Sequence, residues 1–97
     1  MNFNEEKKRS IIEDLYKAVI NIQNLDECEK FFVDVCTEKE IEALAQRLYV
    51  AKLLREDVTY TEIEKETGAS TVTISRVSKA LKKGSDGYRI ILERMGE

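Results

Sequence analysis

Residues 58–83 read VTYTEIEKETGASTVTISRVSKALKK, and this stretch predicts a helix, a tight turn and a second helix. Thr59, followed three residues later by Glu62, is typical of a helix N-terminus because the hydroxyl accepts the Glu62 backbone N–H. The first helix is expected to bury Ile63. It ends at Gly68, since glycine adopts at little cost the backbone conformation that closes a helix.

The second helix of this stretch has two kinds of side chain. Ser70 or Thr71 is expected to cap its N-terminus. Apolar residues then recur close to the helical period of 3.6: Val72, Ile74, Val77, Ala80 and Leu81. Hydroxyl and basic side chains fill the positions between them. Such a pair of helices, covering about residues 59–82, is typical of a DNA-binding helix-turn-helix.

Hydroxyl and basic side chains suit contacts with DNA. Lys and Arg bind phosphates, and hydroxyls and guanidinium groups also bind the donors and acceptors of the major groove. The N-terminal turn of the second helix is expected to enter the groove first, with its free N–H groups directed at phosphate. An ordinary helical hairpin with a solvated polar face gives the same pattern. The residues predicted to contact DNA are Thr59, Tyr60, Thr61, Ser70, Thr71, Thr73, Ser75, Arg76, Lys79, Lys82 and Lys83.

The composition narrows the class of protein. The 97 residues suit a single domain, residues 1–97, and a chain of this size often gains stability by dimerising. There is no apolar run of about 20 residues and no signal-peptide core, which indicates a cytoplasmic protein with no membrane contact. With no His, no metal-ligand spacing, no nucleophile elbow and no phosphate-binding glycine loop, we expect no metal, no cofactor, no catalytic residue and no enzyme.

The net charge of −3 is unevenly distributed along the chain. Residues 70–97 hold six basic and three acidic residues, which gives +3, whereas residues 1–69 hold ten basic and sixteen acidic residues, which gives −6. Salt screens charges beyond about 8–10 Å, so a locally basic surface binds nucleic acid even on an acidic protein. The sign of the net charge therefore does not exclude DNA binding.

The rest of the chain is also predicted to be helical, which gives an all-α fold of about six helices. It contains no proline and no alternating strand pattern. The other helices are expected at Glu5–Ile22, Leu25–Val35, Glu38–Arg55 and Tyr88–Met95. The core stripe of the long third helix is expected to be Ile41, Leu44, Ala45, Leu48, Ala51 and Leu53 or Leu54.

The N-terminal helices carry more apolar surface than a small domain can cover. Helix 5–22 has a wide apolar stripe made of Ile11, Ile12, Leu15, Val19 and Ile22. We therefore predict that residues 5–35 serve mainly in dimerisation.

The second and third helices also have capping signals at their N-termini. These signals are Asn24 with Glu27 and Thr37 with Glu40.

Residues 36–54, CTEKEIEALAQRLYVAKLL, together with the helix-turn-helix, resemble the Trp repressor family. The chain is most similar to the YerC/YecD branch of that family. The resemblance implies an intertwined all-helical homodimer whose two recognition helices enter successive major grooves about 34 Å apart. The matching features, in one register over about residues 36–95, are Thr37, EAL at 42–44, Arg47, the paired leucines 53 and 54, EI at 62–63, TGA at 67–69, TISR at 73–76 and Leu81.

The family also implies a small-molecule switch. In the Trp repressor the corepressor lies between the long helix and the recognition helix, flanked by two arginines and near a threonine. By resemblance Arg47, Arg76 and Thr37 hold these positions here, and two guanidinium groups facing one cavity suit the carboxylate of an amino-acid-like effector. Arg47 fits a surface or salt-bridged arginine equally well, and Arg76 fits a DNA contact better than a ligand contact.

Three departures from the family bear on this switch and on the DNA target. The glycine after the recognition-helix arginine is Val77 here, and a later ligand-binding serine is Ala80. A valine in the indole slot would clash, so tryptophan is not the expected effector, and a smaller ligand or no ligand both stay open. The base-reading arginine of the family corresponds to Thr61, which predicts a different operator.

Together these observations predict a sequence-specific DNA-binding transcriptional regulator, a repressor that acts as a homodimer on a near-palindromic operator. Its expected partners are double-stranded DNA and a second copy of the chain, and a small amino-acid-like effector stays open as a third partner. The alternative is a non-enzymatic protein–protein interaction module that retains the Trp repressor fold. Exposed apolar surface on the first helix beyond the dimer contact would favour that alternative.

Overall fold

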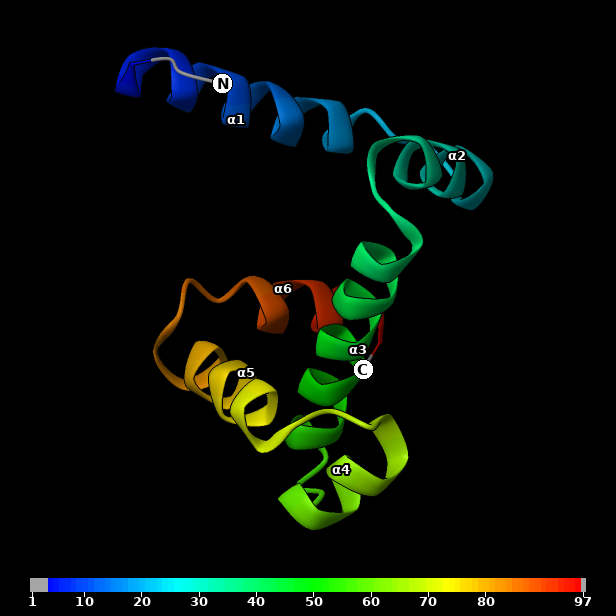
Figure 1. Ribbon diagram of the computed structural model, residues 1–97, viewed down its shortest axis with the longest axis vertical. Coiled ribbons are helices and arrows are strands. Elements are labelled where there is room, and N and C mark those ends of the chain that lie inside the picture. Colours follow the sequence, from blue (N-terminus) through cyan, green and yellow to red (C-terminus); the bar gives the residue numbers. More distant parts are fainter. Residues whose placement is uncertain (1–3, 97) are drawn as a thin grey trace. The chain divides into compact units, whose positions relative to one another are not determined.

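The computed structural model describes residues 4–96, which form six helices and, within that range, no strand (Figure 1). This confirms the predicted all-α fold. The helices are α1 (Glu5–Ile20), α2 (Leu25–Val35), α3 (Glu38–Arg55), α4 (Tyr60–Thr67), α5 (Thr71–Lys83) and α6 (Gly87–Arg94). The predicted end of the first helix at Ile22 is wrong, because the Asn21 side-chain amide binds the Lys17 carbonyl at 2.7 Å and ends the helix two residues earlier.

Side-chain caps set the start of four helices. Asn4, Asn24, Thr59 and Ser70 each accept the backbone N–H three residues ahead, at 2.8, 2.9, 3.3 and 3.1 Å. The carboxylate of Glu27 also accepts the backbone N–H of Gln23 at 3.1 Å, which supports the α2 start from both sides. The predicted caps at Asn24 and Thr59 are therefore confirmed, and of Ser70 and Thr71 the cap of α5 is Ser70.

The chain divides into two compact units, residues 1–38 and residues 39–97, and the second unit contains the buried core. Each of α3, α4, α5 and α6 supplies at least one side chain that is less than 2% exposed: Val50, Ile63, Ile74 and Leu92. Full burial of such a side chain stabilises a fold by about 1.5–3 kcal/mol. Helices α4, α5 and α6 are thus fixed around the C-terminal half of α3.

The predicted core stripe of α3 is only partly correct. Ala51 and Leu53 are buried as expected, but Leu44 is 45% exposed and Ala45 is also exposed. Val50, which was not in the predicted stripe, is fully buried. The core gathers on the last two turns of α3, and Leu44 and Ala45, on earlier turns, lie outside it.

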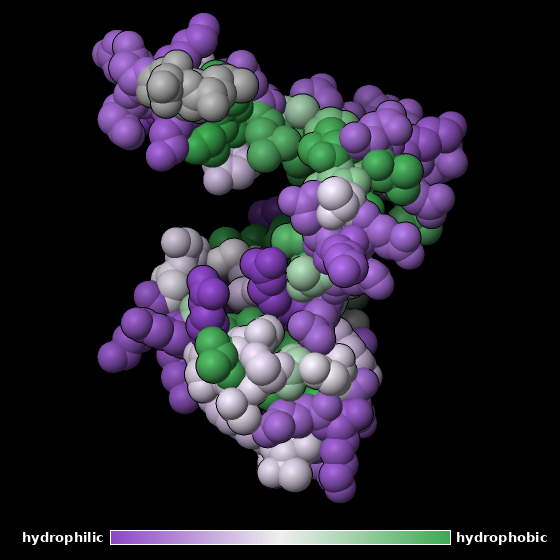
Figure 2. All heavy atoms as spheres, viewed as in Figure 1, coloured by the Kyte–Doolittle hydropathy of each residue, from purple (hydrophilic) through white to green (hydrophobic). Residues whose placement is uncertain are grey.

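In the first unit, α1 and α2 contain no buried residue. The predicted apolar stripe of α1 lies open: Ile11, Ile12, Leu15 and Val19 are 38–45% exposed. Figure 2 shows hydrophobic side chains at the surface of this unit. Among residues 4–96, no helix is both long enough and apolar enough to cross a membrane.

Candidate nucleic-acid interface

Hydrogen bonds made within the turn and by a side chain of α3 hold the turn between α4 and α5 in place. Gly68 adopts the left-handed conformation, with φ 71°, that the sequence predicted for it. The Thr67 hydroxyl donates to the Ile63 carbonyl at 2.7 Å and accepts the Ala69 N–H at 3.0 Å. From α3, the Gln46 side chain donates to the Thr67 carbonyl at 3.1 Å. These bonds fix the angle at which α5 leaves the turn.

Helix α5 is buried on one side and open on the other. Ile74, Val77 and Ser78 are at most 8% exposed and face the core. The opposite side carries hydroxyl and basic side chains that are all exposed, and we call them the polar face of α5: Thr71, Ser75, Arg76, Lys79, Lys82 and Lys83. The helix-turn-helix therefore presents a rigid surface of hydrogen-bond donors and positive charge to solvent.

The remaining residues predicted to contact DNA lie at the two helix starts. Thr59, Tyr60 and Thr61 at the start of α4 are exposed, and so is Ser70 at the start of α5. Thr73 is only half-buried, and its hydroxyl accepts a hydrogen bond from the Ser70 hydroxyl at 3.1 Å. Ten of the eleven predicted side chains are thus accessible, while Thr73 belongs partly to the cap of α5.

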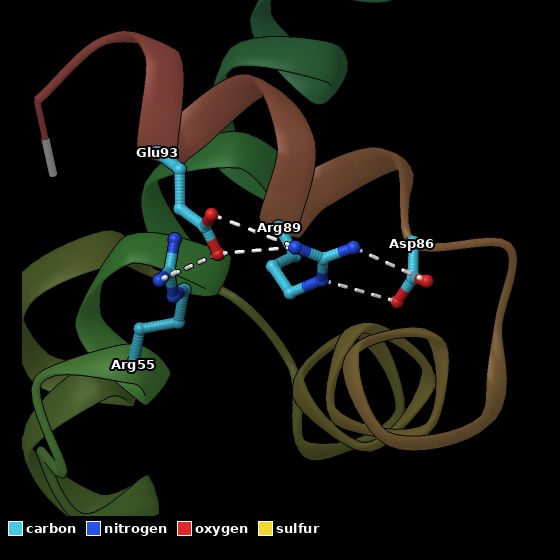
Figure 3. A network of polar contacts seen from close by, with 4 residues as sticks. All are labelled: Arg55, Asp86, Arg89 and Glu93. Atoms are coloured by element: carbon cyan, nitrogen blue, oxygen red, sulfur yellow. Dashed lines mark hydrogen bonds and ion pairs between the residues drawn. The ribbon is translucent and has the colours of Figure 1, made fainter.

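The basic side chains of α5 differ from Arg89 of α6 in their partners. Arg76, Lys79, Lys82 and Lys83 make no ion pair with any residue between 4 and 96. In contrast, Arg89 of α6 lies 3.4 Å from Asp86 and 3.3 Å from Glu93, and Glu93 also lies 3.7 Å from Arg55 (Figure 3). The charge of Arg89 is locally neutralised, whereas no residue between 4 and 96 neutralises the four cations of α5.

Two polar contacts couple ionisable groups to their neighbours. The pKa of Arg89 is raised above its ordinary value, chiefly by its hydrogen bond to Asp86 and next by its hydrogen bond to Glu93. The Tyr49 hydroxyl of α3 donates to Glu66 of α4 at 3.1 Å, and this hydrogen bond to a carboxylate raises the pKa of Tyr49 above its ordinary value. The Tyr49–Glu66 contact ties α3 to α4 and keeps Glu66 on the side of α4 that faces α3.

A cavity of about 510 Å³ opens between α3, α5 and α6, wholly within the second unit. Arg47 of α3 and Arg76 of α5 both line it, as the sequence analysis expected of two arginines facing one cavity. Val77 and Ala80 of α5 and Tyr88 of α6 also line the cavity. Thr37, the third predicted effector residue, belongs to the 1–38 unit, and its role remains a prediction.

A family profile described as Trp repressor protein matches residues 10–96. The chain belongs to the Trp repressor family. The chain is 50% identical over 86 residues to the uncharacterized protein YerC of Bacillus subtilis, an alignment that spans 89% of this chain and 83% of YerC. These matches confirm the resemblance to the Trp repressor family and its YerC-type branch.

Two solved structures share the fold along nearly the whole length. A TrpR-like protein from Eubacterium eligens is 49% identical with a TM-score of 0.88, and the match covers 96% of each chain. A Trp repressor candidate from Staphylococcus aureus is 46% identical with a TM-score of 0.87, covering 98% of this chain and 96% of that one. Membership of the Trp repressor family makes the chain a DNA-binding regulator by class.

Three structural features of this Trp repressor-family chain were not predicted from its sequence. The Gln46 side chain binds the Thr67 carbonyl of the turn. The only local sequence signal for this role is the position of Gln46 on the long helix, one residue before Arg47. Tyr88 lines the cavity from a helix distant in sequence, so no spacing could have placed it there. Val72 was grouped with the apolar positions of α5, but it is 66% exposed and lies outside the core.

Proposed function

We propose that the chain is a sequence-specific DNA-binding transcriptional regulator that inserts α5 into the major groove. The observation that carries this proposal is the polar face of α5, whose four cations lack partners among the described residues while the opposite side of the helix is anchored in the core. Unpaired lysines and arginines on a fixed helix are suited to phosphates, and the hydroxyls of Thr71 and Ser75 are suited to base edges.

The proposed active form is a homodimer on a near-palindromic operator, where it blocks transcription by occupying the promoter. Support comes from the apolar stripe of α1, which no element of the first unit covers. A two-fold dimer places two copies of α5 on matching half-sites. In this proposal residues 1–97 work as one DNA-binding domain, in which residues 5–35 mainly dimerise. The proposed location is the cytoplasm, where the chromosomes of the bacterial relatives lie.

The cavity beside α5 is the proposed site of control by a small effector. Arg47 and Arg76 would bind its carboxylate, and Val77 would exclude a side chain as large as indole. An amino-acid-like ligand smaller than tryptophan fits this chemistry. Because Arg76 belongs both to the cavity lining and to the polar face of α5, a ligand bound to it would alter the surface offered to DNA.

The experiment that tests the proposed function is recovery of genomic fragments by the purified protein over a salt series, with and without a mixture of amino acids. We expect a short two-fold site, bound more weakly as salt rises. Recovery without additives would make the protein a constitutive regulator, with Val77 filling the family's ligand slot. Recovery only with the mixture would make Arg47→Ala the first variant to test. Recovery of no specific fragment under either condition would contradict DNA regulation.

The open apolar surface of α1 and α2 also favours a second candidate, a non-enzymatic protein–protein interaction module. Leu25, Val33 and Val35 of α2 are 83%, 61% and 56% exposed, in addition to the stripe of α1. Exposed apolar side chains in such number favour a role in association. The two candidates differ in their response to salt, because rising salt does not weaken apolar association whereas it strongly weakens contacts with phosphates.

A further inference from the structure

Val72 is the most exposed large apolar side chain of the 39–97 unit, at 66%. It is the second residue of α5, between Thr71 and Thr73. The packing of this unit does not explain a valine there, because Val72 adds nothing to the buried core and valine is a weaker helix former than alanine or lysine. An explanation has to come from what the exposed side of α5 contacts.

Val72 lies among the residues that make up the polar face of α5. Arg76 is four residues further on and Lys79 is seven, so both project from the same side of the helix as Val72. Within residues 60–83 the only other exposed large apolar side chain is Tyr60, at 40%. Val72 is therefore an isolated apolar group on a cationic surface, rather than part of an apolar patch suited to a protein partner.

The edge of a base pair in the major groove offers one apolar group, the C5-methyl of thymine. The first turn of the second helix in a helix-turn-helix is the part that contacts base edges, and Val72 lies in that turn. Its β-branched side chain has few rotamers, so its methyl groups are held in place before the DNA arrives.

We propose that Val72 selects thymine at one position of each operator half-site, by packing against the C5-methyl group. This inference rests on the proposed function, in which α5 enters the major groove. The cations around Val72 supply affinity for the phosphates without regard to sequence, and Val72 adds discrimination between thymine and cytosine. A cytosine at that position presents no methyl group to the valine.

The test uses the full-length protein and an operator selected with it from a library of randomised DNA duplexes. Each thymine of the selected site is replaced singly by uracil, which removes only the methyl group, and binding is measured for the wild type, Val72→Ala and Ile90→Ala. Ile90 is a matched control because it is also an exposed β-branched apolar residue of the 39–97 unit, 37% exposed, but on α6. Thermal unfolding of each variant shows that it is folded.

We expect one thymine per half-site at which uracil weakens wild-type and Ile90→Ala binding about fourfold, the effect of removing one buried methyl group. At that position Val72→Ala is expected to bind the thymine and uracil duplexes equally. Uracil effects of the same size in the wild type and in Val72→Ala would overturn the inference while leaving the proposed function intact, and so would a selected site without thymine. A protein that selects no sequence at all would overturn both.

Discussion

Ile74 and Val72 are two residues apart in α5 but have opposite surroundings, 0% and 66% exposed. We predict that Ile74→Ala lowers the free energy of unfolding by about 2–5 kcal/mol, because it leaves a cavity in a packed core. Val72→Ala is expected to change it by less than about 0.5 kcal/mol, since it removes no core contact. Urea unfolding of the two variants measures both values, and equal losses would contradict the assignment of the two faces of α5.

The conformation of Gly68 gives a second prediction at the residue scale. Its φ of 71° is left-handed, and no heavy atom lies within 4 Å of an added Cβ, so Gly68→Ala meets only backbone strain. We expect a loss of about 1–2 kcal/mol. Gly87→Ala is the control, because Gly87 has equal space and no left-handed φ, and alanine there is expected to be neutral or slightly stabilising. Thermal unfolding that finds the two variants alike would contradict the turn geometry.

At the scale of the element, substitutions of Ser70 can separate the capping of α5 from the role of the α5 N-terminus in DNA binding. Ser70 accepts the Thr73 N–H at 3.1 Å, and Asp and Asn are equally good caps. We predict that Ser70→Asp folds at least as stably as the wild type, because a negative charge is favourable at a helix N-terminus. Its binding to the operator is expected to weaken by about fivefold or more, since phosphate repels the new carboxylate by at least about 1 kcal/mol.

Ser70→Asn is the matched control for this variant, because it keeps the cap without adding charge. Urea unfolding gives the stability of both variants, and fluorescence anisotropy with a labelled operator gives the binding. Operator binding of Ser70→Asp as tight as that of Ser70→Asn would place the start of α5 away from the DNA and contradict the proposed docking.

The elements were predictable from the sequence to the extent that local signals define them. The caps at Asn24, Thr59 and Ser70 and the glycine at position 68 lie within a few residues of the ends they set, so α2, α4 and α5 follow from the sequence. The buried side of α3 does not, because it depends on which helices cover each turn. Val50 rather than Leu44 is buried for that reason.

The candidate site was likewise predictable only where its residues lie within one segment of the sequence. The polar face of α5 follows from helical spacing within one segment. The cavity joins α3, α5 and α6, so the pairing of Arg47 with Arg76 was expected only through the family resemblance, and Tyr88 was not expected at all. The exposure of Val72 was also missed, because periodicity alone groups a valine with the core.

At the scale of the whole molecule, the open stripe of α1 predicts that dimerisation depends on the N-terminal helices. Removing residues 1–22 is expected to leave a monomeric or unfolded protein. In the full-length chain, Leu15→Glu is expected to shift the protein to monomers, because Leu15 lies in the stripe and a buried carboxylate without a partner is costly. Lys17→Gln makes the same change in net charge on the exposed side of α1 and is expected to remain dimeric. Light scattering measures the masses, and a dimeric truncation would contradict the role given to α1.

The central claim of the proposed function is that the four cations of α5, which make no ion pair within residues 4–96, bind DNA phosphates. The most direct test is the salt dependence of operator binding for Lys79→Gln and for Lys30→Gln, an equal change of charge on an exposed lysine of α2. For Lys79→Gln we predict that the slope of log K against log salt becomes shallower by roughly one unit for each phosphate that the variant no longer neutralises, about two per homodimer. Lys30→Gln is expected to keep the wild-type slope. The same slope in both variants, or binding that does not respond to salt, would contradict the claim.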